Sequence, residues 1–207
     1  MKKGLLIALE GPDGCGKSTQ IELLDKYFRE KGFDVIKTRE PGGTAISEKI
    51  RNIILDNNNS EMGHMCEALL YAASRAQLTD EVIKPAIDAG KIVICDRFVY
   101  SSMVYQGIGR GLGMEVVKSI NDAALRGLEA DLVFMITIPY DEGLERKKKQ
   151  RELDRLENVG NDFHRKVFEG YSKISETYDK IIVIDGNNEI DNVHNQIITH
   201  IEQKFKI

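Results

Sequence analysis

Residues 11 to 19 combine side-chain types that can hold a chain of phosphates. They read GPDGCGKST, and Gly11, Gly16, Lys17 and Ser18 stand at the spacing of a phosphate-binding loop. Glycines let backbone N–H groups approach phosphate oxygens, the lysine can span the β and γ phosphates, and the serine hydroxyl can ligate Mg²⁺. The pattern therefore predicts a nucleoside triphosphate site with Mg²⁺. The residues expected to contact the nucleotide are Gly11, Pro12, Asp13, Gly14, Cys15, Gly16, Lys17, Ser18 and Thr19.

An aspartate followed by an arginine supplies the second half of such a site. Asp96 ends the apolar run IVICD, and Arg97 follows it. A carboxylate held rigidly at the end of a strand suits Mg²⁺, and the neighbouring guanidinium suits a phosphate. A lone aspartate in this position more often caps a turn or a helix, so the phosphate-binding loop gives the pair its weight. The expected metal ligands are Ser18 and Asp96.

Short apolar runs, rich in isoleucine and valine, alternate with longer segments of helical spacing. This alternation predicts parallel strands joined by crossover helices, and strands that are apolar throughout predict a sheet covered on both faces. We therefore expect one three-layer α/β domain, residues 1–207, with a five-stranded parallel sheet flanked by helices. Pro85 is expected to kink a helix that runs towards Gly90. The expected strands are 5–9, 35–38, 92–96, 132–138 and 181–185, and the apolar stripe of the last helix is Ile190, Val193, Ile197, Ile198, Ile201 and Phe205.

Composition and charge argue against several other classes of protein. The hydrophobic content of 42% is enough for a full core, and the formal net charge of −4 argues against a chain-wide electrostatic hold on nucleic acid. The apolar run at residues 5–9 is too short for a secretory signal, and no run approaches membrane-spanning length. Three widely spaced cysteines predict neither a disulfide framework nor a paired metal site. We expect a cytoplasmic protein that binds neither nucleic acid nor membrane.

Four further motifs resemble those of bacterial thymidylate kinases, in order and in spacing. They are TREPGGT (38–44), LLYAASRAQL (69–78), DRFVYSSMVYQG (96–107) and RELDRLE (151–157). The resemblance runs from the first expected strand to the last helix. It implies a P-loop kinase fold with a small lid at about residues 145–158. It also implies ATP as the phosphoryl donor, Mg²⁺ as the metal, thymidine monophosphate as the acceptor and a homodimer. An apolar-faced pair of helices within residues 62–125 can serve as its interface.

The resemblance also implies an acceptor site. Arg51 and Arg97 match the family's phosphate-binding arginines and can fork onto the acceptor phosphate. Tyr71 matches the aromatic residue on which thymine stacks. Arg75, four positions later and on the same helix face, matches the arginine that donates to a base carbonyl.

The remaining acceptor contacts are implied in the same way. Ser102 and Gln106 match polar residues at the base edge, and Tyr105 matches an aromatic residue against the deoxyribose. Glu40 is expected beside the acceptor site, where it can orient Arg51 or Arg97. Asp13 holds the family's acidic position in the phosphate-binding loop and can reach the sugar 3′-hydroxyl or a metal-bound water.

The densely charged segment 145–157 resembles the bacterial lid. By itself, such a run more often forms a solvated helix face. However, no basic residue stands at positions 12–15 of the loop, so the charge that stabilises the transition state must come from elsewhere. We assign it to Arg151, with Arg155 in support, both facing ATP. The expected catalytic residues are Lys17, Arg97, Arg151 and Asp13.

Two other functions remain open at this point. One is a kinase for another pyrimidine nucleoside monophosphate, which Arg75 disfavours because it donates to a carbonyl and not to an amino group. The other is a nucleotide-dependent switch that binds without catalysis. A switch needs neither a second anion site nor an arginine-bearing lid. The four histidines, at positions 64, 164, 194 and 200, are interpreted as structural or exposed.

Overall fold

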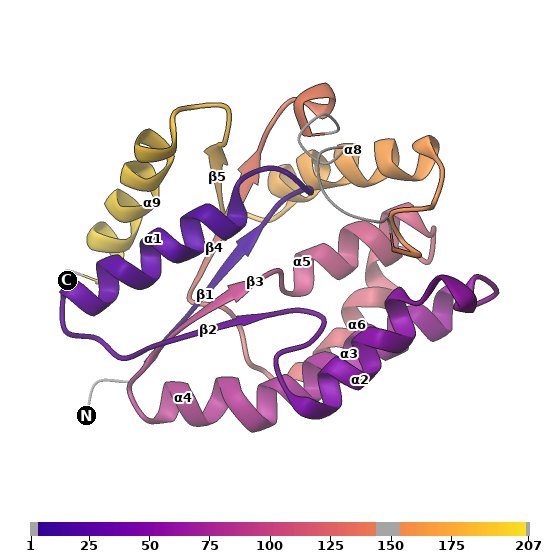
Figure 1. The fold of residues 1–207 in the computed structure, drawn as a ribbon, viewed down its shortest axis with the longest axis horizontal. Helices are drawn as coiled ribbons and strands as arrows, with labels where there is room; N and C mark the ends of the chain where they lie inside the picture. The colour runs from indigo at the N-terminus through magenta and orange to yellow at the C-terminus, as the bar shows by residue number, and fades with distance from the viewer. Residues whose placement is uncertain (1–3, 144–153, 206–207) are drawn as a thin grey trace.

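Five parallel strands form the central sheet of the computed structural model, which describes residues 4–143 and 154–205 (Figure 1). Their order across the sheet is β2-β3-β1-β4-β5. All five expected strands are present, and the three-layer α/β prediction is confirmed. The strands are β1 (Leu5–Glu10), β2 (Val35–Arg39), β3 (Ile92–Asp96), β4 (Leu132–Thr137) and β5 (Ile181–Asp185).

Two helices, α1 (Lys17–Glu30) and α9 (Ile190–Phe205), cover one face of the sheet (Figure 1). Their apolar stripes pack with β1, β3 and β4 in one core cluster, to which Leu24 and Phe28 of α1 and Ile197 and Ile201 of α9 belong. Of the expected stripe of the last helix, Val193, Ile197 and Ile201 are buried, and Ile198 and Phe205 are partly buried. Its first member, Ile190, is 55% exposed because it lies at the beginning of the helix.

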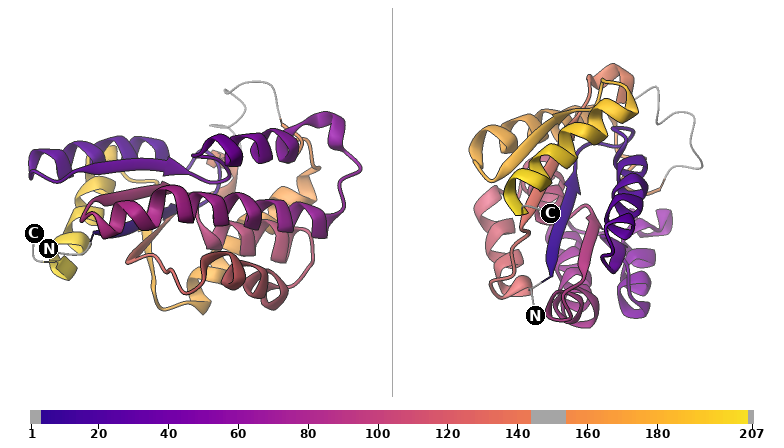
Figure 2. Two further views of the ribbon diagram at one scale, coloured as in Figure 1. Left: turned by 90° about the horizontal axis from the view of Figure 1, so that it is seen from below. Right: turned by 90° about the vertical axis from the view of Figure 1, so that its left-hand side faces the viewer.

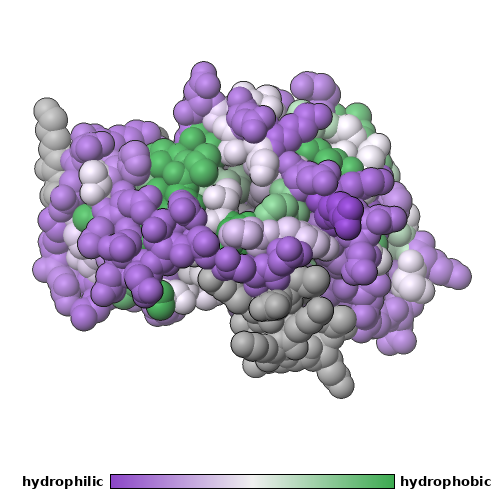
Figure 3. Space-filling view, turned by 90° about the horizontal axis from the view of Figure 1, so that it is seen from above, coloured by the Kyte–Doolittle hydropathy of each residue, from purple (hydrophilic) through white to green (hydrophobic). Residues whose placement is uncertain are grey.

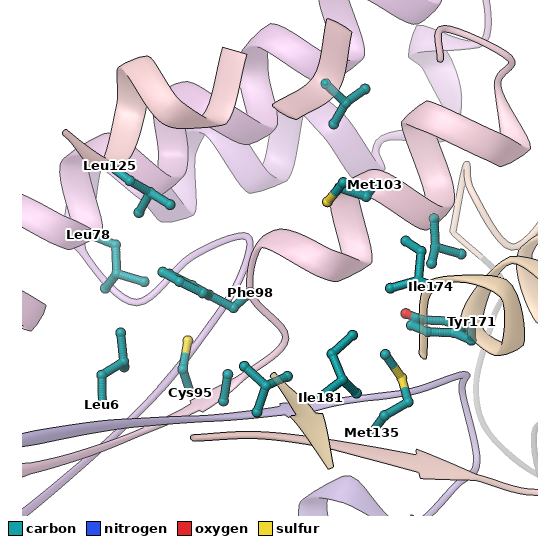
Figure 4. Packing of buried hydrophobic residues seen from close by; sticks show 14 of the residues in the cluster. Leu6, Leu78, Cys95, Phe98, Met103, Leu125, Met135, Tyr171, Ile174 and Ile181 are labelled. Atoms are coloured by element: carbon teal, nitrogen blue, oxygen red, sulfur yellow. The ribbon is translucent and has the colours of Figure 1, made fainter. Parts of the chain in front are cut away.

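The remaining helices cover the opposite face, and the views in Figure 2 show the resulting layers. Their side chains form a second core cluster, in which Phe98 faces Leu78 and Cys95 while Tyr171 lies beside Ile174 (Figure 4). These helices are α2 (Ala45–Leu55), α3 (His64–Leu78), α4 (Lys84–Asp88), α5 (Val99–Ser102), α6 (Met114–Leu125) and α8 (Asn161–Thr177). A short 3₁₀ turn, η1 (Asn57–Asn59), follows α2. Among the helices within these described ranges, none is both long and apolar enough to cross a membrane.

Two π-helical segments interrupt the helices on this face. The first, η2 (Thr79–Ile83), joins α3 to α4 and ends just before Pro85. A proline has no N–H to donate and its ring collides with the carbonyl four residues earlier, so a widened turn at this point relieves the clash. The expected irregularity at Pro85 is therefore present, as a π segment. The second, η3 (Met103–Gly109), continues α5.

The strand register brings several polar side chains to one edge of the sheet. Asp96 is opposite both Leu9 of β1 and Arg39 of β2, so these strands end at the same level. β1 lies between β3 and β4, where the direction of the chain connections reverses. In open parallel sheets, ligands bind outside the carboxyl ends of the strands at such a point. The phosphate-binding loop follows β1 directly and lies there.

Candidate active site

The phosphate-binding loop connects β1 to the beginning of α1, and its glycines are required by its shape. Gly11 has φ +136°, and a Cβ at this position would lie 2.2 Å from the carbonyl oxygen of Ile136. Gly16, the N-cap of α1, has a left-handed conformation with φ 98°. Most side chains would strain such a backbone. The loop thus directs the N-terminus of α1, which is the positive end of the helix dipole, towards the space above the loop.

Lys17 is folded back over the loop. Its side chain is 7% exposed, and Nζ donates to the carbonyl oxygens of Gly11 and Pro12 at 3.0 and 2.9 Å. Two of the nine expected loop contacts, Gly11 and Pro12, therefore lie behind the lysine and hold it in position.

A cavity opens above the loop, and we call it the phosphate-loop cavity. It is lined by the loop from Asp13 to Thr19, by Asp96 and Arg97, and by the segment from Gly186 to Ile190 after β5. The exposed face over this end of the sheet is mostly hydrophilic, with hydrophobic patches between polar side chains (Figure 3). The segment 186–190 was missed by the sequence analysis because GNNEI carries no phosphate-binding or catalytic signature.

The geometry at Asp96 fits a metal ion. Its Oδ1 is buried and has no hydrogen-bond partner among the described residues. An unpaired buried carboxylate oxygen is costly unless a cation or a donor reaches it. Ser18 lines the same cavity and is exposed. Within the described part of the chain, no three side chains of histidine, cysteine, aspartate or glutamate gather into a metal cluster. A site with one carboxylate and one hydroxyl suits Mg²⁺, which keeps several waters.

A second cavity lies beside the first, and we call it the arginine cavity after Arg51, Arg75 and Arg97 in its wall. The structure brings together in it all eight residues that the resemblance implies for the acceptor. They come from α2, α3, the loop after β2, the turn after β3, α5 and η3. These residues are Glu40, Arg51, Tyr71, Arg75, Arg97, Ser102, Tyr105 and Gln106.

Arg97 stands at the boundary of the two cavities. It is in a left-handed backbone conformation with φ 66°, unusual for a residue with a side chain. Its guanidinium donates to the carbonyl of Gly11 at 3.0 Å and to the hydroxyl of Tyr171 at 2.6 Å, and it pairs with Asp13. Arg97, Asp13 and Glu157 line both cavities. Two anion-binding cavities that share these charged residues suit transfer of a group between two phosphates.

Comparison with known proteins agrees with this geometry. A family model described as thymidylate kinase matches residues 9–197. The chain belongs to the thymidylate kinase family. Similar proteins named thymidylate kinase include one from Finegoldia magna, 48% identical over 200 residues that cover 97% of this chain and 98% of the relative. Another, from Geobacillus sp. (strain WCH70), is 53% identical over 194 residues, 92% of each chain. A third, from Thermoanaerobacter sp. (strain X514), is 50% identical over 197 residues, 95% of this chain and 96% of the relative.

In this member of the thymidylate kinase family, Arg75 is held by several protein acceptors. It is 1% exposed, and its Nε donates to Glu40 at 2.7 Å. Its Nη1 donates to Ser102 and Asn121, and its Nη2 donates to the carbonyl of Phe98 at 2.9 Å and contacts Glu40. A bond from Arg75 to a base carbonyl therefore requires one of these acceptors to be exchanged.

The partner of Arg75, Glu40, is buried in the wall of the arginine cavity. Burial raises its pKa to about 7, against the lowering effect of the Arg75 guanidinium, and the nearby Glu10 adds to the increase. Its Oε1 has no hydrogen-bond partner within the described residues. Glu40 thus orients Arg75, and not Arg51 or Arg97 as the sequence suggested. Arg51 instead donates to the carbonyl of Pro41 at 2.9 Å.

The structure corrects the expected position of Arg155. The sequence predicts that this side chain faces ATP, but it is buried behind the arginine cavity, where it pairs with Glu67 at 2.7 Å. A buried guanidinium needs a carboxylate and carbonyl acceptors, and α2 and α3 supply both. Arg151 and most of the expected lid lie outside the described residues.

Several residues of the site carried no signal in the sequence. His164, interpreted as structural or exposed, lines the arginine cavity, where its Nε2 lies 3.0 Å from the carbonyl oxygen of Glu157. Tyr171 reaches Arg97 from α8, and Ser101 donates from its hydroxyl to the buried Glu10. Glu10 itself could have been found, because a glutamate that ends an otherwise apolar strand requires buried donors.

Proposed function

We propose that this chain transfers the γ-phosphoryl group of ATP directly to thymidine monophosphate, from the phosphate-loop cavity to the arginine cavity. The activity is that of the thymidylate kinase family. The observation that carries the proposed route is the boundary between the cavities, where Asp13, Arg97 and Glu157 line both.

The phosphate-loop cavity takes ATP. The backbone N–H groups of the loop and the N-terminus of α1 bind its phosphates, and Lys17 exchanges the carbonyls of Gly11 and Pro12 for phosphate oxygens. Asp96 and Ser18 would hold Mg²⁺, whose charge neutralises phosphate oxygens when it is bound. The segment 186–190 lines this cavity and not the arginine cavity, so it is available to the nucleoside of ATP.

The arginine cavity takes the monophosphate. Arg51 and Arg97 bind its phosphate, and because the second pKa of a phosphate monoester is about 6, the attacking oxygen is already an anion at neutral pH. That oxygen forms a bond to the γ-phosphorus of ATP as the bond to the bridging oxygen breaks, which gives the diphosphate and ADP. No side chain has to accept a proton. Arg97 stabilises charge on both sides of the transfer.

The nucleoside of the acceptor lies among aromatic and polar residues. Tyr71 stacks on thymine, Tyr105 lies against the deoxyribose, and Ser102 and Gln106 face the base edge. A niche for the thymine methyl group contributes only about 1–3 kcal/mol. Deoxyuridine monophosphate is therefore expected to be a poorer but real substrate.

Arg151 remains our proposal for the charge that stabilises the transferred phosphoryl group. An arginine in this role contributes a factor of about 10³ or more to turnover. Replacing Arg151 with alanine should lower turnover by that factor while monophosphate binding stays nearly intact.

A homodimer is the proposed assembly. Of the helices within the expected range 62–125, α3 packs on α2, which precedes that range, and the two carry exposed apolar side chains: Ile53 is 48% and Leu69 is 51% exposed. Exposed apolar residues gathered on adjacent helices favour burial against a second copy.

A coupled assay of ADP release with a panel of monophosphates tests the function. We expect thymidine monophosphate to give the highest kcat/KM and deoxyuridine monophosphate a lower one. A preference for deoxycytidine or uridine monophosphate would establish the alternative kinase, and nucleotide binding without ADP release would establish a switch.

A further inference from the structure

A buried carboxylate lies behind the arginine cavity and is held by three residues from two separate segments. Glu67 of α3 is fully buried. Its Oε1 accepts from Nε2 of Gln106 at 3.0 Å and from Arg110 at 3.1 Å. Its Oε2 accepts from Arg110 at 2.9 Å and from Arg155 at 2.7 Å. Burial alone would raise the pKa of Glu67, but the hydrogen bonds from Arg110, Gln106 and Arg155 hold it below its ordinary value.

Arg155 is fixed at both its backbone and its side chain. Its N–H donates to the carbonyl of Leu55 at 3.1 Å, and its Nε donates to the carbonyl of Ile54 at 2.6 Å. With the ion pair to Glu67, these bonds attach the segment at Arg155 to the end of α2 and to α3. None of these three contacts involves the phosphate-binding loop.

The neighbours of Arg155 face the other way. Asp154, Leu156 and Glu157 all line the arginine cavity, as does Leu55. The direction of the Arg155 side chain therefore sets which residues of this segment form the cavity wall. Gln106, the other partner of Glu67, also lines the cavity, and its Oε1 has no hydrogen-bond partner in the part of the chain that the structure describes.

We propose that the ion pair of Glu67 with Arg155 is a positioning device for the monophosphate site, which holds Asp154–Glu157 and Gln106 against the acceptor nucleotide. This inference rests on the proposed function, because it takes the arginine cavity as the monophosphate site. It reassigns Arg155 from the ATP side to the acceptor side. Glu67 and Arg155 are positioning residues, since they act through their neighbours and through Gln106.

The two arginines on Glu67 offer a matched pair of variants. Arg110 and Arg155 are similarly buried and bond to the same carboxylate, with exposed side-chain fractions of 10% and 7%. Arg155→Gln leaves Glu67 with Arg110, and Arg110→Gln leaves it with Arg155. Both variants weaken the buried ion pairs, but only the first releases the segment 154–157.

Steady-state kinetics on the full chain, with each substrate varied in turn, test the proposal. We expect Arg155→Gln to raise KM for thymidine monophosphate about tenfold, equivalent to about 1.4 kcal/mol of binding. Its KM for ATP should stay within about twofold of wild type, because the phosphate-loop cavity is intact. Arg110→Gln should leave both KM values within about twofold. Calorimetric titration with thymidine monophosphate alone should show the same loss of affinity for Arg155→Gln only.

Three outcomes would overturn the proposal. They are equal effects of the two variants on the acceptor KM, an increase in KM for ATP alone, and an unchanged acceptor KM in Arg155→Gln. If Arg155→Gln does not fold, Arg155→Lys replaces it, since an ammonium cannot donate to Glu67 and Ile54 with the geometry of a guanidinium. A KM for thymidine monophosphate unchanged in Arg155→Lys also contradicts the proposal. Failure of the proposed function is seen separately, as a wild-type enzyme that does not phosphorylate thymidine monophosphate.

Discussion

Three buried glutamates hold residues in or behind the wall of the arginine cavity, and each has its own set of donors. Glu10 accepts the backbone N–H groups of Phe98 and Ser101 at 2.9 and 3.2 Å, and so fixes the turn that carries Arg97. Glu40 binds Arg75, and Glu67 binds Arg110 and Arg155. A buried carboxylate without such partners would be strongly destabilising. These carboxylates therefore orient three arginines and the turn that carries Arg97 around the arginine cavity.

Asp96 differs from these glutamates, since its Oδ1 has no partner among the residues described. If this oxygen ligates Mg²⁺, Asp96→Asn should raise the Mg²⁺ concentration for half-maximal activity about tenfold or more. This Mg²⁺ concentration is measured by titrating the activity with MgCl₂ at saturating concentrations of both nucleotides. Asp88→Asn, in an exposed position of α4, is the control. An unchanged Mg²⁺ dependence in Asp96→Asn would remove this residue from the metal site.

Glu40 predicts a pH dependence of stability. Its pKa rises from the ordinary value of 4.5 to about 7 on folding, so the folded state favours the protonated carboxyl. The stability that this shift contributes is complete below the unfolded pKa and is lost as the pH rises through about 7. Between pH 4.5 and about pH 7, we expect the free energy of unfolding of wild type to fall relative to that of Glu40→Gln. Urea unfolding at a series of pH values measures this difference. Glu115→Gln, exposed on α6, should show no such trend, and a constant difference for Glu40→Gln would contradict the prediction.

At the scale of elements, the phosphate-binding loop depends on its neighbours β4 and β5 as well as on β1 and α1. Gly11 packs against the backbone of Ile136 at the end of β4. Gly186, just after β5, donates its N–H to the carbonyl of Thr137 at 2.7 Å. The space available to the loop is therefore set by elements more than a hundred residues away in sequence.

Gly186→Ala should disturb the ATP side selectively. The added Cβ would lie 2.7 Å from Cγ2 of Ile136 and 3.0 Å from the carbonyl oxygen of Cys15 in the loop. Overpacking of this kind costs about 1–3 kcal/mol, so we expect KM for ATP to rise about fivefold or more. KM for thymidine monophosphate should change little in the same assay. Gly63→Ala is the control because its Cβ would meet nothing within 4 Å, and an unchanged KM for ATP in Gly186→Ala would contradict the expectation.

At the scale of the whole molecule, the parallel sheet gives one functional edge. The carboxyl ends of β1, β2 and β3 hold the phosphate-binding loop, Glu40, Asp96 and Arg97 within one region. The helices on one face, α1 and α9, line the phosphate-loop cavity, whereas α2, α3, α5 and α8 line the arginine cavity. The outer surface of α2 and α3 is left with exposed apolar residues.

The proposed homodimer predicts the effect of a charge on that surface. In the proposed dimer, Leu69→Glu would place one carboxylate from each subunit in the interface. Burial of these charges and the repulsion between them both oppose association. We expect sedimentation velocity at micromolar concentration to show a dimer for wild type and a monomer for Leu69→Glu. Val183→Glu, an equally exposed apolar position on β5, should remain dimeric. A wild-type monomer, or a dimer in both variants, would contradict the proposed surface.

Much of this protein could be predicted from sequence because the signals are local. The glycine spacing of residues 11–18 specifies a phosphate-binding loop, since only such residues permit the backbone conformations it needs. Short apolar runs predicted all five strands because strands buried on both faces must be apolar throughout. The resemblance then supplied eight residues for the acceptor, all of which the structure brings together in the arginine cavity.

The tertiary structure alone decided the direction of the charged side chains. Arg155 and Glu67 are 88 positions apart, and nothing near Arg155 in sequence indicates that its partner lies on α3. Arg97 depends likewise on Tyr171, 74 positions later. Local sequence determines which conformations a segment can adopt, whereas the partner of a buried charge is determined by the elements that the fold packs against it. The sequence therefore defined the chemistry of the site, and packing decided which carboxylate or hydroxyl each buried arginine binds.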